Sequence, residues 1–141
     1  MALSEFNNTA DTTADYDAKD IADNKIYAIL SYIGLLFLVP IFAAPDSKFA
    51  RFHANQGILA CIVAVGWSII NFILLSILGI IFPYKEVLGN ALSRGLIYAL
   101  LTSVFQLVYI IPAVLIIIGI INAAKGKAKE LPFIGKFRIL K

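Results

Sequence analysis

Three long apolar runs constrain this chain more than any motif does. They cover residues 26–44, 58–82 and 96–122, and none of them contains a charged residue. A helix needs about 20 apolar residues to cross about 30 Å of hydrocarbon, so the first run just meets that length and the others exceed it. Splitting the third run at Pro112 into a helical hairpin would need roughly 36 residues, more than it has. The sequence predicts an all-α integral membrane protein with three transmembrane helices.

Composition supports a membrane protein of one domain. Hydrophobic residues make up 60% of the 141 positions and charged residues 15%, whereas a soluble domain has about half and about a quarter. The first run follows an acidic segment, not a basic one, so we expect no cleaved signal peptide. The single Cys61 lies in the second run, where we expect it to be a small buried apolar residue.

Polar tails flank the membrane domain, which covers residues 25–124. Residues 1–24 hold six of the nine acids and few large apolar residues, which predicts an acidic, disordered tail. Residues 125–141 alternate basic and apolar residues. This pattern predicts contact with anionic lipid headgroups, and the apolar residues between the cations disfavour nucleic acid as a partner.

The distribution of Lys and Arg predicts an orientation in the cell membrane. With three spans, the first connector and the C-terminal tail share one side and carry eight of these residues. The N-terminal tail and the second connector share the other side and carry four. By the positive-inside rule, the C-terminus is expected in the cytoplasm and the N-terminus outside. Four spans, with both termini on one side, remain the alternative.

The first connector has the periodicity of a short amphipathic helix. Phe49, Phe52, His53 and Gln56 share one helical face, and Ser47 is a favourable capping residue before them. The sequence predicts an interfacial helix over residues 46–56 that bends or runs directly into the second span. Its Phe rings are expected at the acyl boundary and its cations at the headgroups. His53 and Gln56 are expected to face the bundle and to bond the first span or the C-terminal tail.

Two interpretations of this connector stay open. Its side chains are either structural or form a contact surface for a partner or for lipid. The candidates for that surface are Phe49, Arg51, Phe52, His53, Asn55 and Gln56.

This sequence has few residues that could act in catalysis or bind a metal ion. His53 is the only histidine and Cys61 the only cysteine, so no set of three or four soft ligands can be assembled. No acid lies inside a predicted span, although ion-coupled transport needs an ionisable group there. We predict no metal, no cofactor and no enzymatic activity.

Two amides and two prolines interrupt the apolar runs. Asn71 and Gln106 are each expected to face protein, because an unpaired amide is costly in hydrocarbon. They could bond each other or bond separately to a hydroxyl such as that of Ser68. Pro40 and Pro112 are expected to kink the first and third spans.

The motifs resemble those of a known family. The residues that carry this resemblance are Tyr32-Ile-Gly34, Pro45-Asp-Ser-Lys48, Phe52-His-Ala-Asn-Gln-Gly57 and Leu131-Pro-Phe-Ile-Gly-Lys136. Over residues 25–141 the chain resembles a widespread family of small prokaryotic membrane proteins of unknown function. That family is similar in turn to the twenty-kilodalton Tic subunit of the chloroplast protein import machinery, which is described with four spans. The resemblance implies no catalytic residue.

Two function classes follow. The first is an accessory or structural subunit of a membrane complex with other membrane proteins as partners, and the resemblance implies a role in protein transport or insertion. The second is a self-associating channel lined by Asn71, Gln106 and Ser68. Three helices cannot enclose a water-filled pore, so the second class requires a homo-oligomer.

Overall fold

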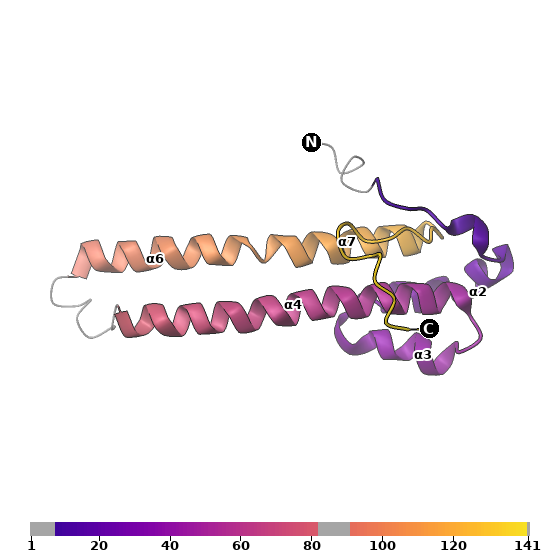
Figure 1. The fold of residues 1–141 in the computed structure, drawn as a ribbon, viewed down its shortest axis with the longest axis horizontal. Coiled ribbons are helices and arrows are strands. Elements are labelled where there is room, and N and C mark those ends of the chain that lie inside the picture. Colours follow the sequence, from indigo (N-terminus) through magenta and orange to yellow (C-terminus); the bar gives the residue numbers. More distant parts are fainter. Residues whose placement is uncertain (1–7, 82–90, 141) are drawn as a thin grey trace. The chain divides into compact units, whose positions relative to one another are not determined.

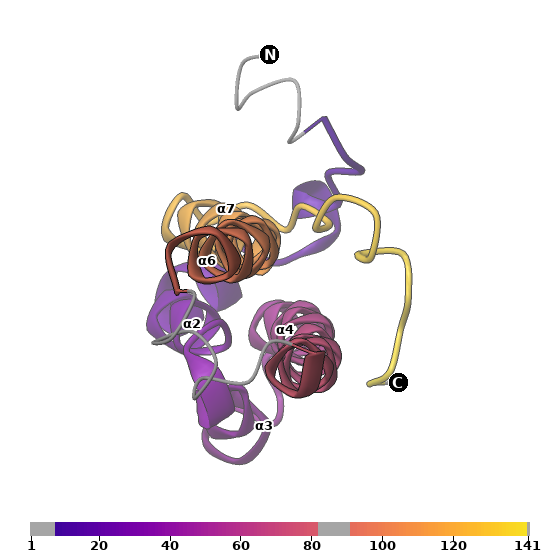
Figure 2. The same cartoon turned by 90° about the vertical axis from the view of Figure 1, so that its left-hand side faces the viewer.

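A computed structural model describes residues 8–81 and 91–140 of the chain (Figures 1 and 2). The predicted end of the second span at Phe82 and the first part of the acidic tail lie outside these residues. The elements are η1 (Thr13–Asp15), α2 (Ala18–Leu30), η2 (Gly34–Phe37), α3 (Leu38–Ala43), α4 (Lys48–Ile81), α6 (Ala91–Leu107) and α7 (Ile110–Ala124). Within the described ranges there is no strand, only an isolated bridge between Asp11 and Lys129. The predicted all-helical class is confirmed.

The chain divides into two compact units. The first unit comprises residues 1–63 and 112–141, and the second comprises residues 64–111. The helices α4 and α7 contribute to both. The candidate site residues of the connector all lie in the first unit, and Asn71 and Gln106 lie in the second.

Two stretches are long and apolar enough to cross a membrane. They are Lys48–Ile81, with 34 residues, and Gly95–Ala124, with 30 residues. Only 17% and 22% of their most apolar windows are buried inside the structure, whereas the core helix of a soluble protein is mostly buried. At about 1.5 Å per residue, each exceeds the roughly 30 Å of a bilayer core.

The first apolar run does not form a third spanning helix. The helix α2 ends at Leu30, and after a break the chain continues through η2 into α3, which contacts α2 (Figure 2). Gly34 has a φ of +52° in this break, a conformation that glycine adopts without strain. The expected single helix over residues 26–44 is therefore replaced by a helical hairpin. Pro40 lies in the first turn of α3, where its missing N–H costs little, and the break precedes it.

The third run is interrupted, as predicted, close to Pro112. The helix α6 ends at Leu107 and α7 begins at Ile110. Proline cannot donate to the carbonyl of Val108, four residues earlier. That carbonyl instead accepts the N–H of Ile111 at 3.0 Å, and the N–H of Tyr109 reaches Gln106 at 3.1 Å.

The connector continues into the second span without a bend. The helix α4 begins at Lys48 and passes through Gly57 to Ile81. The helix begins two residues after its predicted start at residue 46, and of the two predicted continuations the direct one is observed. Residues 48–56 of the predicted interfacial segment are therefore the first part of α4.

The core of the first unit joins α2, α4, α7 and the C-terminal tail. Its buried residues are Ala28, Tyr32, Phe49, Phe52, Ala60, Ile118, Ala123, Ala128 and Leu131. Four of these nine are alanines, which allow helix backbones to approach closely. The N-terminal region takes part as well, because Ala18–Leu30 is helical where the sequence predicted a disordered tail as far as residue 24.

Candidate functional site

The start of α4 is capped from two directions. The hydroxyl of Ser47 accepts the N–H of Ala50 at 2.9 Å, as the sequence predicted. The carboxylate of Asp20, on α2, accepts the N–H of Phe49 at 3.0 Å. A carboxylate at this position also favours the positive end of the helix dipole. The role of Asp20 was missed because nothing in the sequence brings α2 to this end of α4.

His53 lies in an aromatic cluster. Its Nδ1 is 2.9 Å from the hydroxyl of Tyr32, and its ring meets those of Phe49 and Phe52 edge to face at 4.7 Å and 5.2 Å. Tyr16 packs on both phenylalanines, at 6.1 Å and 5.8 Å. His53 is fully buried, so within the first unit it is a core residue.

Asn55 and Gln56 hold the C-terminal tail. The amide of Gln56 accepts the N–H of Leu131 at 3.0 Å and donates to the carbonyl of Gly135 at 2.9 Å. The amide of Asn55 donates to the carbonyl of Phe137 at 2.8 Å. Its oxygen accepts the N–H groups of Ile139 and Leu140 at 2.6 Å and 3.0 Å. Two adjacent amides thus satisfy five backbone groups of the tail.

The structure brings five of the six connector candidates together in the core, and only Arg51 is exposed. The predicted contacts of His53 with the first apolar run and of Gln56 with the tail are confirmed. The predicted position of Phe49 and Phe52 at the acyl boundary is wrong, because they are 0% and 6% exposed and covered by protein. The sequence did not show that the tails would fold over them: Arg138 of the tail lies 5.2 Å from the centre of the Phe52 ring.

The N-terminal segment pairs with the C-terminal tail. The N–H of Thr12 donates to Ala128 at 3.0 Å, and the N–H of Glu130 donates to Ala10 at 3.1 Å. Between these bonds, Asp11 lies opposite Lys129. The Thr13 hydroxyl donates to the carboxylate of Asp11 and holds the pKa of that group below its usual value. The N-terminal segment and the C-terminal tail, which three spans would place on opposite sides of a membrane, are thus paired within the first unit.

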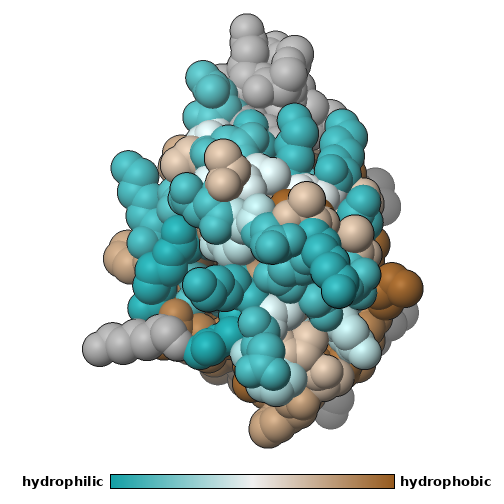
Figure 3. Space-filling model, turned by 90° about the vertical axis from the view of Figure 1, so that its right-hand side faces the viewer, coloured by the Kyte–Doolittle hydropathy of each residue, from teal (hydrophilic) through white to brown (hydrophobic). Residues whose placement is uncertain are grey.

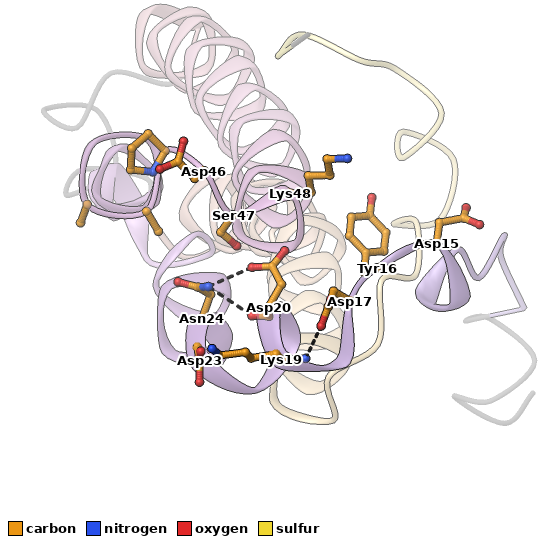
Figure 4. A pocket seen from close by; sticks show the side chains of 13 residues that line it. Asp15, Tyr16, Asp17, Lys19, Asp20, Asp23, Asn24, Asp46, Ser47 and Lys48 are labelled. Atoms are coloured by element: carbon orange, nitrogen blue, oxygen red, sulfur yellow. Dashed lines mark hydrogen bonds between the residues drawn. The ribbon is translucent and has the colours of Figure 1, made fainter.

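An acidic cleft of about 640 Å³ opens beside the start of α4 (Figure 4). It is lined from the N-terminal segment, from α2 and from the chain between α3 and α4. Its charged residues are Asp15, Asp17, Lys19, Asp20, Asp23, Asp46 and Lys48. Hydrophilic side chains cover most of the face on which the N-terminal segment and the start of α4 lie (Figure 3). The described residues contain no group of His, Cys, Asp and Glu arranged to hold a metal ion.

A small polar cluster lies in the second unit. Asn71 is buried, as predicted, and its amide donates to the hydroxyl of Tyr109 at 3.4 Å. The Tyr109 hydroxyl is also 3.4 Å from the hydroxyl of Ser68. The Tyr109 ring meets the Trp67 ring edge to face, with 6.4 Å between the ring centres. Gln106 instead is exposed on α6, and the two amides, both among the described residues, do not bond each other. The contact of Tyr109 with Asn71 was not predicted. The signal for it was the position of Tyr109 three residues before Pro112, at the helix interruption that turns its side chain toward α4.

Comparison with protein families identifies the chain. A model described as the magnetosome magnetite crystal formation protein family (MamF/MmsF) matches residues 23–138. The chain belongs to this family. The matched residues run from α2 through the connector into the C-terminal tail. The MamF/MmsF family is a small, membrane-associated family. No match is found among curated proteins or solved structures, and no comparison shows the expected similarity to the Tic subunit.

Proposed function

We propose that the chain is a non-catalytic accessory subunit of a membrane complex. In this proposal it spans the membrane twice, with α4 and with Gly95–Ala124, and presents its folded first unit on the cytoplasmic side. The observation that carries the proposal is the union of connector, N-terminal segment and C-terminal tail in one packed unit. The connector's buried amides bond five backbone groups of the tail there, so the first unit offers a fixed surface.

The distribution of cations supports the orientation. With two spans, the N-terminal segment, the first connector and the C-terminal tail share one side and carry ten of the twelve Lys and Arg residues. Only Lys85 and Arg94 remain for the other side. This asymmetry is larger than the eight-to-four division that three spans give. By the positive-inside rule it favours a cytoplasmic first unit with both termini in the cytoplasm.

The surface of the first unit offers two kinds of contact. The acidic cleft has the charge to take a basic segment of another subunit. The tail exposes Lys136 and Arg138 beside Phe133, which is 83% exposed, a combination suited to anionic headgroups and the acyl boundary.

Family membership is consistent with an accessory role. The family is named for magnetite crystal formation at the magnetosome, and we propose that this chain likewise assists a process at a membrane. The transport role that the sequence resemblance implied has no support in the comparisons. The channel alternative is weakened because Asn71, its best pore-lining candidate, is buried and bonded to Tyr109.

A disulfide cross-link tests the topology. Asp11 and Lys129 lie opposite each other in an antiparallel bridge. The backbone bonds lie on either side of them, so they are a non-hydrogen-bonded pair, whose Cα atoms are close enough for a disulfide. In a Cys61→Ser background, Asp11→Cys with Lys129→Cys should form an intramolecular disulfide in isolated membranes under mild oxidation. Reporters fused to the two termini should both report the cytoplasm. Reporters on opposite sides would overturn the two-span proposal.

Photo-cross-linking tests the accessory role. A photoreactive residue at Lys48 in the cleft should give a discrete product with a different protein in the native membrane. The control is the same residue at Leu100, which is 66% exposed on α6. A product of twice the chain's mass from both positions would instead favour the self-associating alternative.

A further inference from the structure

The hairpin formed by α2, η2 and α3 exposes large apolar side chains along its length. Ile26 is 71% exposed, Leu35 71% and Phe42 78%. We infer that this hairpin is a re-entrant element, which dips into the acyl region of the leaflet nearest the termini and returns to the same side. The inference rests on the membrane location in the proposed function.

The hairpin is too short to cross. The four residues of η2 rise about 2 Å each and the six of α3 about 1.5 Å each, or about 17 Å together, against roughly 30 Å of hydrocarbon. The two ends of the hairpin also meet, because the acidic cleft is lined both by Asp17 and Asp20 at the start of α2 and by Asp46 after α3. A segment whose charged ends share one cleft enters and leaves on one side.

Three backbone donors of the turn between α2 and η2 are bonded internally, as irregular backbone in a membrane requires. Such backbone is tolerated only where its polar groups are bonded internally and shielded by protein. The N–H groups of Ser31, Tyr32 and Ile33 bond the carbonyls of Tyr27, Ile29 and Leu30 at 3.1–3.2 Å. Ser31 is 0% exposed and Tyr32 3%. The turn therefore brings no unbonded donor at these three positions into hydrocarbon.

Two glycines allow the turn to pack closely against the long helices. A Cβ at Gly57 of α4 would lie 1.8 Å from the carbonyl oxygen of Ser31. A Cβ at Gly119 of α7 would lie 2.2 Å from the ring of Tyr32. Within the first unit, the turn thus docks directly on the two stretches that cross the membrane.

Acyl chains fit the exposed surface better than a protein partner does. Residues 33–38 are Ile-Gly-Leu-Leu-Phe-Leu, so the tip has no side chain that could form a hydrogen bond to a partner. The charged residues of α2 all precede Ile26, as expected for a helix whose start lies in the headgroups and whose end lies deeper.

Depth-dependent quenching tests the inference. In a Trp67→Phe background, single tryptophans are placed by Leu35→Trp at the tip, by Lys19→Trp at the start of α2 and by Ile73→Trp in the C-terminal half of α4. The purified variants are reconstituted in phosphatidylcholine vesicles containing lipids brominated on their acyl chains. We expect strong quenching at positions 35 and 73, and little at position 19.

The three positions separate the possible failures. Absence of quenching at position 73 would overturn the membrane location itself. Quenching at position 73 without quenching at position 35 would overturn the re-entrant hairpin and point to a protein surface at its tip. Equal quenching at positions 19 and 35 would contradict the tilt of α2 from headgroups to acyl chains. Phe42→Trp gives a second readout should Leu35→Trp fail to fold.

Discussion

Gln56 and Gly135, 79 residues apart, are joined by a buried hydrogen bond of 2.9 Å from the side-chain amide to the backbone carbonyl. The same amide accepts the N–H of Leu131, whose own carbonyl accepts the N–H of Gly135 at 2.9 Å. A Cβ at Gly135 would lie 2.4 Å from the nitrogen of Leu131, so this tight turn requires glycine. Two motifs far apart in the sequence, the one around Gln56 and the one over residues 131–136, therefore contact each other directly.

Replacing Gln56 should release the tail. Gln56→Ala leaves the buried N–H of Leu131 without a partner, which costs about 1–3 kcal/mol. It also removes one of the two bonds to the carbonyl of Gly135, which still accepts from Arg138 at 3.2 Å, and a lost bond costs about 0.5–1.5 kcal/mol. We expect a loss of about 2–4 kcal/mol in stability, seen as a lower melting temperature in detergent, and faster tryptic cleavage at Lys136 and Arg138. Lys48→Ala, at an exposed position, is the control and should change stability by less than about 0.5 kcal/mol. An unchanged cleavage rate for Gln56→Ala would show that the tail does not depend on this amide.

The glycines that hold the hairpin should not tolerate a methyl group. Gly57→Ala places a Cβ on the backbone of Ser31, which cannot move without opening the turn. We expect a destabilisation of at least about 2 kcal/mol, measured by thermal unfolding in detergent. Gly66→Ala is the matched control, since nothing lies within 4 Å of its Cβ. On the same helix it should be neutral or stabilise by about 0.5–1 kcal/mol. Similar losses for both variants would remove the argument for close packing at Gly57.

Periodicity and length correctly predicted structure that local spacing determines. They failed for structure that tertiary contacts determine. The start of α4, its cap at Ser47 and the inward turn of His53 and Gln56 follow from local spacing. The first apolar run has the composition of a span, yet it folds as a hairpin because Ser31 and Tyr32 dock on glycines far along the chain. Hydropathy does not report such docking. The covering of Phe52 by Arg138 was hidden for the same reason.

The pair of Tyr32 and His53 should show measurable coupling. Tyr32→Phe removes the hydroxyl that lies 2.9 Å from Nδ1 and keeps the ring packed on Gly119. We expect it to lose about 0.5–1.5 kcal/mol, the usual net value of a hydrogen bond. His53→Ala should cost more, because it also empties the space among Phe49 and Phe52.

A double-mutant cycle isolates the bond from the packing. In the His53→Ala background, the loss from Tyr32→Phe should fall close to zero, since its partner is already absent. Additive losses would show that the phenol acts through other contacts. In that case the Tyr32 hydroxyl would not stabilise the fold through His53.

Asn71 should respond differently from Gln56, although both are buried amides. Its single bond, to Tyr109, is long at 3.4 Å, and its carbonyl oxygen has no partner among the described residues. Interhelical bonds of this kind contribute about 0.6 kcal/mol on average. The burial of an unbonded oxygen offsets that gain.

We therefore expect Asn71→Leu to leave the melting temperature in detergent unchanged or raised, whereas Gln56→Leu should lower it. The comparison also addresses the channel alternative. If the protein conducts ions when reconstituted in planar bilayers and Asn71→Leu abolishes the current without loss of stability, Asn71 lines a pathway and the accessory role is wrong. If no current is seen with either protein, Asn71 serves the packing of α4 against Tyr109, as its burial indicates.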